Sequence, residues 1–382
     1  MFETAGALVA FSSAANAGIT IPAGDWTVDL GGNVNAYYAN TKTTGAQSTN
    51  TIGTGLLPAA IGIGAKSRQN DLDVAVQFTF FTGTSTGNNG TLSSNTLNIR
   101  QAFLTFGDAS WGQVKLGRDL GVFGSDAILS DMTLLGVGAN YAPNGSSTLG
   151  RIGSGYMYAD WFGQIAYSTP NWNGFQATGA IIEPIVNSAS GDATNSNLGY
   201  QGKITYDFAV NDVTGRVWVS GLTQKHDAGT ALSVENSSGN GLSSTAATAA
   251  YTSTGFDIGA KASYQGLGLV GYYYNGDGLS GAHGILDGRL FQAGTKTKDS
   301  GGYVQATFVV PGVGTKLGAS WGENNTNQSG VDYTNESWIV GAYHPLTKSV
   351  NLVAEYSYGK ITGGTAAEVD VKTTSLGAIL FF

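Results

Sequence analysis

The chain has 382 residues, 58 of them glycine and none cysteine, and its formal net charge is −8 at pH 7. The lack of cysteine excludes disulfides and thiolate metal sites, and the negative charge argues against nucleic acid as a partner. Only 12% of the residues are charged, about half the share of a soluble domain. We therefore expect apolar residues spread singly along alternating strands. No apolar stretch is long enough for a transmembrane helix, and no break in composition separates domains.

The first residues resemble the end of a secretory leader. Residues 8–11 are apolar and Ala15-Asn16-Ala17 matches an A-x-A cleavage site, although Glu3 stands where a leader has Lys or Arg. We interpret residues 1–17 as the remnant of a signal peptide, with an ordinary apolar extension as the alternative. Residues 18–382 are expected to form one domain.

Residues 26–39 show a pattern that recurs to the end of the chain. Trp26, Val28 and Leu30 fall on one face, and Thr27 and Asp29 fall on the other, which is the period of two of a β-strand. Short turns are expected near 70–71, 108–112, 170–174, 211–212, 266, 311–312 and 345–349, and long polar loops over 40–58, 83–95, 184–197, 225–253, 277–299, 324–335 and 361–370.

The number of strands depends on residues 151–168. Counted as two strands, they break the alternation of short turns and long loops. Counted as one long strand bent near Asp160, they preserve it and the total is sixteen. We therefore predict an all-β fold, a transmembrane antiparallel β-barrel of 16 strands with short turns at one rim and long loops at the other. Aromatic residues near strand ends fit the girdles that flank lipid: Trp26, Trp172, Tyr206, Phe208, Trp338 and Tyr358.

A long insert interrupts this pattern between strands near Val114 and Ile152. It runs roughly from Asp119 to Leu149, and it is too apolar to extend into water although it carries Asp126 and Asp131. Long loops in compact folds are usually functional. We predict that this third loop folds into the lumen of the barrel.

The stretch VKLGRDLGVF before the insert, LGRIGSGYMY after it and the terminal Phe382 resemble the general porins of Gram-negative outer membranes, which are trimeric and sixteen-stranded. The resemblance covers essentially residues 26–382. It implies a passive channel for ions and small hydrophilic solutes, with a water-filled pore narrowed by the loop 119–149. A substrate-specific porin with a solute-binding track is the alternative.

The resemblance also implies a location and partners. The protein would be a homotrimer in the bacterial outer membrane, in contact with lipid and lipopolysaccharide, with no nucleic acid and with neither cofactor nor metal. Phe382 is similar to the signal that the barrel-assembly machinery recognises.

Charged residues from the wall and from the loop are expected at the constriction. Arg68 and Arg100 match the family's basic wall positions, whereas Asp126 and Asp131 match only the acidic character of the loop. Where the family often has another arginine after the loop, this chain has Tyr158-Ala159-Asp160, and nearby Arg151 is the candidate to replace it. The predicted pore residues are Lys66, Arg68, Arg100, Lys115, Arg151, Asp119, Asp126 and Asp131.

The basic members lie on polar strand faces, which fits a water-filled lumen because an outward charge at mid-depth costs about 2–4 kcal/mol. For each of them, a solvated wall charge without effect on passage is the alternative. Basic and acidic residues balance between residues 60 and 155. We therefore expect weak ion selectivity with a slight preference for cations.

Two motifs typical of enzymes are better explained by strands. GLGLVG at 266–271 matches a dinucleotide fingerprint, but another strand follows it where a helix is required. GASWG at 318–322 matches a nucleophile elbow, but its residues alternate along a strand. The three histidines, His226, His283 and His344, lack metal-site spacing. A membrane-barrel enzyme such as an outer-membrane phospholipase and a soluble all-β binding protein are the less favoured alternatives.

Overall fold

The computed structural model describes residues 18–83, 97–139, 147–184, 196–228, 232–235, 242–245, 249–279, 296–364 and 368–382. The predicted leader, residues 1–17, and His283 lie outside this part of the chain. None of the described helices is long and apolar enough to cross a membrane.

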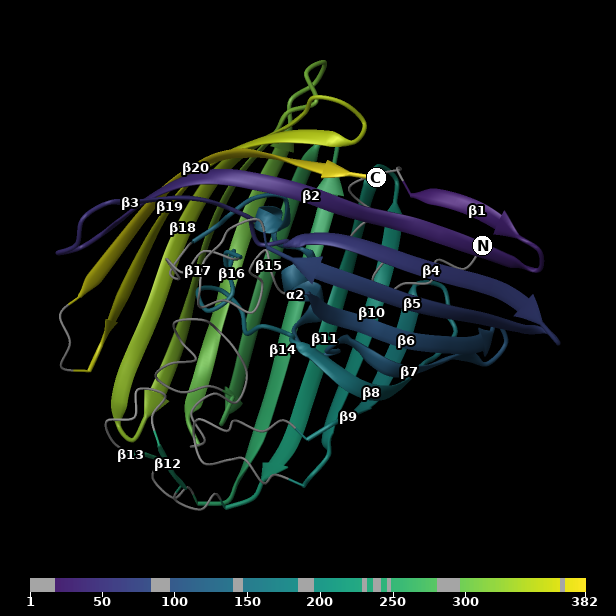
Figure 1. Ribbon diagram of the computed structural model, residues 1–382, viewed down its shortest axis with the longest axis horizontal. Coiled ribbons are helices and arrows are strands. Elements are labelled where there is room, and N and C mark those ends of the chain that lie inside the picture. The colour runs from purple at the N-terminus through teal and green to yellow at the C-terminus, as the bar shows by residue number, and fades with distance from the viewer. Residues whose placement is uncertain are drawn as a thin grey trace.

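Sixteen of the described strands pair in chain order into a closed antiparallel barrel (Figure 1). The ring closes where β20 pairs with β2, with Ala378 opposite Ala36. Closure leaves no unpaired strand edge, which is what lipid requires. The barrel strands are β2 (Trp26–Thr43), β4 (Ala59–Gln69), β5 (Leu72–Thr82), β6 (Asn98–Asp108), β7 (Gly112–Leu120), β8 (Trp161–Ser168), β9 (Phe175–Ile182), β10 (Gly199–Val210), β11 (Val213–His226), β14 (Tyr251–Tyr264), β15 (Leu267–Asp277), β16 (Lys298–Val309), β17 (Lys316–Gln328), β18 (Val331–Pro345), β19 (Val350–Gly363) and β20 (Val369–Phe381).

Four shorter strands accompany the barrel. β1 and β3 both pair with β2, and β12 and β13 form a separate hairpin between β11 and β14. β3 covers the loop-side half of β2 and β4 covers the other half, so the second barrel strand is interrupted between them. Their bounds are β1 (Ile19–Ala23), β3 (Thr49–Gly53), β12 (Leu232–Glu235) and β13 (Leu242–Thr245).

The two ends of the described chain meet along β2. Phe381 of β20 lies opposite Asn33, and Ile19 of β1 lies opposite Leu30, so β1 continues the line of β20 (Figure 1). Phe382 exchanges two backbone hydrogen bonds with Gly32, of 2.9 and 3.1 Å. A Cβ atom at Gly32 would lie 2.9 Å from Cζ of Phe382. The last residue is therefore part of the seam, and its role as an assembly signal stays a prediction.

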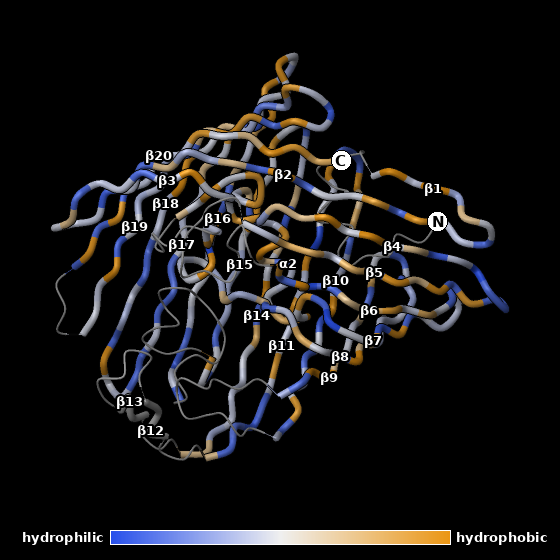
Figure 2. Tube along the Cα trace, viewed as in Figure 1, coloured by the Kyte–Doolittle hydropathy of each residue, from blue (hydrophilic) through white to orange (hydrophobic). Residues whose placement is uncertain are grey.

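Hydrophilic and hydrophobic residues alternate along many of the strands (Figure 2), and burial alternates with them. Outward side chains are mostly apolar and exposed, for example Ile204 at 52%, Val304 at 57% and Leu376 at 56%. Aromatic side chains gather near the strand ends on this outer face. Phe175 stacks on Tyr206 at 4.2 Å near the short-turn rim, and two predicted girdle residues, Trp338 and Tyr358, lie 6.0 Å apart on the loop side.

The predicted strand number and short turns are confirmed, but two predicted loops are wrong. Within 40–58, β2 continues to Thr43 and β3 returns along it. Within 324–335, β17 and β18 are joined by a tight turn at Ser329-Gly330, where both residues have positive φ. In these regions both strand faces are polar, as in Asn324–Gln328, so hydropathy alternation disappears although the hydrogen-bonded ladder continues.

The predicted long strand 151–168 is also wrong in its first part. β8 begins only at Trp161, and residues 151–160 form turns and isolated bridges. The bend predicted near Asp160 is present, because this residue adopts a positive φ of 55°. The segment between β7 and β8 is therefore longer than predicted.

Candidate pore constriction

Residues 121–160 connect β7 to β8. Their described parts, 121–139 and 147–160, which we call the lumen segment, contain the only helices among the described residues. These are α2 (Ser125–Leu129) and the 3-10 helix η1 (Met132–Leu135). Gly124 begins α2 in a left-handed conformation with φ 74°, which glycine adopts without a steric penalty. Figure 1 shows α2 within the ring of strands.

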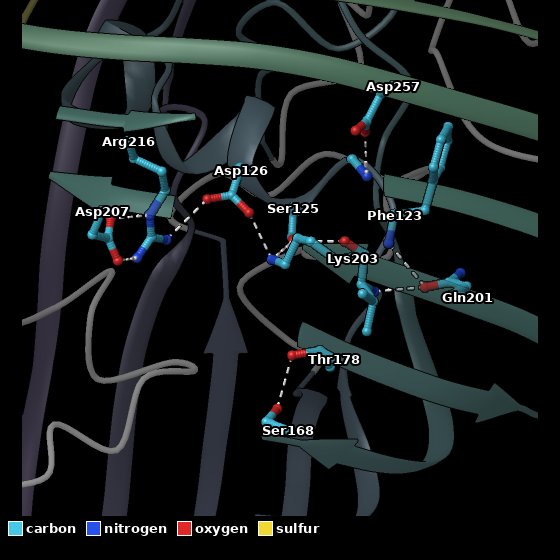
Figure 3. Close-up of polar contacts among 12 residues, drawn as sticks. Phe123, Ser125, Asp126, Ser168, Thr178, Gln201, Lys203, Asp207, Arg216 and Asp257 are labelled. Carbon is cyan, nitrogen blue, oxygen red and sulfur yellow. Dashed lines mark hydrogen bonds and ion pairs between the residues drawn. The ribbon is translucent and has the colours of Figure 1, made fainter. Parts of the chain in front are cut away.

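Inward-facing side chains of the wall accept hydrogen bonds from the backbone of the lumen segment. Gln201 Oε1 on β10 accepts from the amides of Val122 and Phe123 at 2.6 and 3.0 Å. Asp257 on β14 accepts from the amide of Gly124 at 3.0 Å (Figure 3). Irregular backbone that is buried needs such partners because it has no ladder of its own.

The same pattern continues on the far side of the barrel. Glu355 Oε2 on β19 accepts from the amides of Val137 and Gly138, both at 2.7 Å. Gln305 on β16 accepts from the amide of Met132 at 2.8 Å and donates to the carbonyl of Ser130 at 3.0 Å. The lumen segment is thus fixed to strands from β10 to β19.

An apolar core lies between the lumen segment and the wall. Phe123 and Tyr156 of the segment are fully buried, and the Tyr156 ring lies 5.8 Å from that of Tyr303 on β16. Inward aromatic residues of β11 and β15 complete this core, which also explains the apolar character of the insert. Its buried members are Leu56, Phe123, Ala127, Ile128, Ile152, Tyr156, Met157, Trp218, Leu222, Tyr272, Tyr274, Leu279 and Tyr303.

The interruption between β3 and β4 also contacts the lumen segment. Residues 54–58 leave the wall, and the amide of Leu56 donates to the carbonyl of Gly136 at 2.8 Å. Asn35 on β2 holds this interruption, accepting from the Gly55 amide and donating to the Leu57 carbonyl, both at 2.9 Å. The wall therefore bends inward to support the segment.

Asp126, a predicted pore residue in the first turn of α2, pairs directly with the wall (Figure 3). Its carboxylate lies 2.6 Å from Lys203 Nζ on β10 and 3.1 Å from a guanidinium nitrogen of Arg216 on β11. Arg216 also pairs with Asp207 at 2.6 Å. Asp126 therefore contacts the basic wall directly.

Neighbouring charges keep Asp126 ionised. Burial by itself raises the pKa of the Asp126 carboxyl, but the positive charges and hydrogen bonds of Lys203 and Arg216 outweigh burial and hold the pKa below its ordinary value. The ion pairs of Asp126 are thus fully present above the ordinary pKa of a carboxyl group. They are lost only when the pH falls through the lowered pKa of Asp126.

Asp131 and Arg151 are buried inside the lumen segment. Asp131 caps η1 by accepting from the Thr133 amide at 2.9 Å, and it accepts from the Tyr156 hydroxyl at 2.7 Å. The Arg151 guanidinium donates to Ser320 on β17 and to Ser337 on β18, with distances from 2.7 to 3.3 Å. Both side chains fix the segment, and neither is exposed to passing solute.

The remaining predicted residues lie in three places. Lys115 pairs with Asp119, whose carboxylate also accepts from Gln101 at 2.9 Å at the start of the lumen segment. Lys66 pairs with Asp29 at 2.9 Å on β2. Arg68 lies at the short-turn rim, where it pairs with two carboxylates at the strand ends, those of Asp73 and Asp108 at 2.9 and 3.1 Å.

Arg100 lies beside the end of the lumen segment. Its guanidinium carbon is 4.9 Å from the centre of the Phe81 ring and 5.9 Å from that of Trp161. It also donates to the Tyr158 hydroxyl at 3.4 Å. These contacts are favourable cation–π interactions, and they hold Arg100 against the wall near the start of β8.

Sequence reasoning did not identify Arg216 as a pore residue, although the alternation along β11 places it on the inward face. Arg216 has the same inward parity on β11 as Trp218 and Ser220, which are buried. It lies directly opposite Lys261 on β14. Together with Lys203, these residues form what we call the basic cluster: Lys203, Arg216 and Lys261.

These observations define a closed membrane barrel whose lumen is crossed by a fixed internal segment with a charged wall beside it. The family model described as Gram-negative porin matches residues 4–364, and the chain belongs to this family. It is an outer-membrane porin that crosses the membrane with its strands. Family and fold point to a passive channel and not to an enzyme.

Solved structures of outer-membrane channels share the fold. The anion-selective porin of Comamonas acidovorans is 16% identical, with a TM-score of 0.62 over 94% of this chain and 100% of that one. OmpF of Salmonella typhi, in complex with daunomycin, is 17% identical, with a TM-score of 0.61 over 95% and 100%. DcaP of Acinetobacter baumannii is 14% identical, with a TM-score of 0.65 over 96% and 100%. No curated protein matches the sequence.

Within the described part of the chain, no three or more His, Asp or Glu side chains are grouped so that they could hold a metal ion. His226 and Ser253 lie 3.0 Å apart, but the Ser253 hydroxyl donates to the Gly278 carbonyl at 2.5 Å. The serine proton is therefore already engaged away from the imidazole, and this pair does not have the geometry of an activated nucleophile.

Arg151 provides a test of the fixed segment. Arg151→Ala should lower the free energy of unfolding in detergent by about 2–4 kcal/mol, because several buried hydrogen bonds to a charged group are lost. Arg68→Ala is the control, since an exposed ion pair contributes little to stability. Urea titration of both variants, with single-channel recording of current noise, measures the difference. Equal effects of the two substitutions would contradict a clamping role for Arg151.

Proposed function

We propose that the protein is a passive diffusion channel for small hydrophilic solutes, narrowed by the lumen segment and weakly selective for anions. The observation that carries this proposal is the imbalance of inward charges next to the segment. The basic cluster contributes three cations, and the carboxylates paired with it are those of Asp126 and Asp207. One positive charge remains in excess.

Other inward charges do not reverse this excess at the passage, because the carboxylates of Asp257 and Glu355 are buried where they accept from the amides of the segment. Lys66 and Lys115 are each matched by a carboxylate, that of Asp29 and of Asp119. Lys316, at the start of β17, places its ammonium 4.9 Å from the centre of the Tyr343 ring and makes no ion pair within the described residues. The charges that remain exposed beside the segment therefore favour anions, in place of the slight cation preference expected from sequence.

Because of its position, the basic cluster should influence ion selectivity more than the net charge of the whole chain does. Arg216 pairs with Asp126 of the segment, and Lys261 lies directly opposite Arg216 on the inward face of β14, which supports a position of both beside the passage. Charges that line a narrow passage with a low-dielectric wall set the local ion concentration. The C. acidovorans structure is that of an anion-selective porin, which supports the proposal.

Charge-neutralising substitutions should shift selectivity in opposite directions. Lys261→Gln should move the reversal potential in a salt gradient towards cations, and Asp126→Asn should move it towards anions. A unit charge about 8 Å from the ion in water contributes about 0.5 kcal/mol, which is about a twofold change in permeability ratio. The Asp126→Asn effect should be as large at pH 5 as at pH 7, because the lowered pKa keeps this carboxylate charged.

Lys225→Gln is the matched control for these measurements. It removes the same charge from the outward face of β11, where Gln224 and His226 are the buried inward neighbours. It should leave the reversal potential unchanged. If Lys261→Gln behaves like Lys225→Gln at low salt, where screening is weak, the basic cluster does not line the passage.

We further propose a homotrimer. The support is the family together with OmpT of Vibrio cholerae, a structure of similar fold that is described in a trimer form. Light scattering in a mild detergent should give three times the mass of the chain, and dilution should not dissociate the complex. A monomer mass under these conditions would contradict this assembly.

A further inference from the structure

Two basic side chains face each other directly on the lumen side of β11 and β14. Arg216 and Lys261 are antiparallel partners. Each shares a strand face with a buried residue, Trp218 on β11 and Asp257 on β14. Like charges directly opposite across an antiparallel pair are destabilising. A negative group close to both side chains would remove this repulsion.

Carboxylates of the chain neutralise Arg216 but not Lys261. The Arg216 guanidinium donates to Asp207 at 2.6 and 2.7 Å and to Asp126 at 3.1 Å (Figure 3). These bonds engage three of the five N–H donors of a guanidinium group. Within the described part of the chain, Lys261 lies in no ion pair. None of the described residues therefore supplies the negative group that Lys261 lacks.

Two hydroxyl groups lie next to the charged pair. Thr214 and Ser263 are also antiparallel partners, and their Oγ atoms lie 2.7 Å apart. Each lies two residues closer to the short-turn end of its strand than the basic residue does, and a spacing of two places it on the same face. Both are exposed. The hydroxyl that accepts this hydrogen bond keeps its own proton for another acceptor.

Together these side chains form what we call the four-residue patch: Thr214, Arg216, Lys261 and Ser263. Directly opposite residues have Cβ atoms about 5 Å apart, and alternate residues of a strand are about 7 Å apart. The patch therefore presents two cationic groups and a hydroxyl donor within reach of a single small anion. Solvent reaches it, because the Arg216 side chain is 31% exposed and Lys261 is half-buried.

We propose that the four-residue patch binds one small oxyanion, a sulfate, phosphate or carboxylate, during passage through the channel. Such an anion has several acceptor oxygens, so it can accept from a guanidinium, an ammonium and a hydroxyl group at once. Hydrogen bonds of this charge-assisted kind are stronger than neutral ones. A halide is a single acceptor atom and does not span the two rows of the patch.

This site rests on the proposed function in one respect, that the basic cluster lies beside the passage. It adds a saturable binding step and a preference for oxyanions over halides, neither of which follows from weak anion selectivity alone.

Competition for the patch can be measured on the folded protein in planar bilayers. In dilute KCl, where screening is weak, small additions of potassium sulfate or potassium acetate should lower the single-channel current to a plateau, because an anion bound at the patch delays chloride. Potassium bromide at the same concentration should have no such effect, since bromide lacks the oxygens. The half-blocking concentrations of sulfate and acetate then show which oxyanion the patch prefers.

Substitutions in the patch should raise the half-blocking concentration of sulfate. Lys261→Gln should raise it about tenfold, because a hydrogen bond between charged groups is lost. Thr214→Val/Ser263→Ala should raise it about threefold through loss of the hydroxyl donor. The double substitution changes no charge, so its effect cannot come from the field of the basic cluster.

Thr223→Val/Thr254→Val is the matched control. Thr223 and Thr254 are antiparallel partners on the same two strands, and both are exposed on the outward face. This double substitution should leave the block unchanged.

The site and the proposed function can fail separately. A reversal potential in a KCl gradient that favours cations would contradict the proposed function. The oxyanion site is overturned by any of three results: a current that neither sulfate nor acetate lowers, an equal effect of bromide, or a half-blocking concentration that either patch variant leaves unchanged.

Discussion

Buried backbone must find hydrogen-bond partners, and this requirement governs both layers of the protein. In the wall, lipid offers no partners, so the strands close into a ring between β2 and β20. Inside the ring, the lumen segment has almost no ladder of its own, and the wall provides partners through side chains. Gln201, Asp257, Gln305 and Glu355 accept from its amides. The position of the segment follows from where these four acceptors stand on their strands.

The inward face of the wall therefore has two roles, to form a core with the segment and to provide charged side chains. Part of it, with Tyr303 and Trp218, is aromatic and forms a core with the segment. Another part is charged, and its charges differ in use. Asp257 and Glu355 are buried where they hold the segment, whereas the basic cluster is the part that we propose to lie beside the passage with a positive excess. Under the proposed function, passage is controlled by the wall charges that do not anchor the segment.

Much of the fold could be predicted from sequence because alternation follows directly from one apolar and one polar environment. The prediction failed where both faces of a strand have the same environment. Residues 324–328 extend beyond the lipid belt, so both faces are polar and resemble a loop. Residues 151–160 alternate because Ile152 and Tyr156 enter a core, not because they form a ladder. The sequence identified both Asp126 and Asp131 as acidic residues of the loop. It could not show that Asp131 caps a helix whereas Asp126 pairs with the wall, because aspartate is suited to both roles.

The most direct test of the fixed lumen segment uses a pair of cysteines in this cysteine-free chain. The hydroxyls of Ser154 in the segment and Ser337 on β18 lie 2.8 Å apart, so cysteine sulfurs at these two positions would lie close enough to react. In the variant Ser154→Cys/Ser337→Cys, we predict that mild oxidation forms the disulfide nearly completely and leaves the single-channel conductance equal to that of the reduced form. A pair that stays reduced, or a conductance that changes on oxidation, would contradict a segment held against the wall.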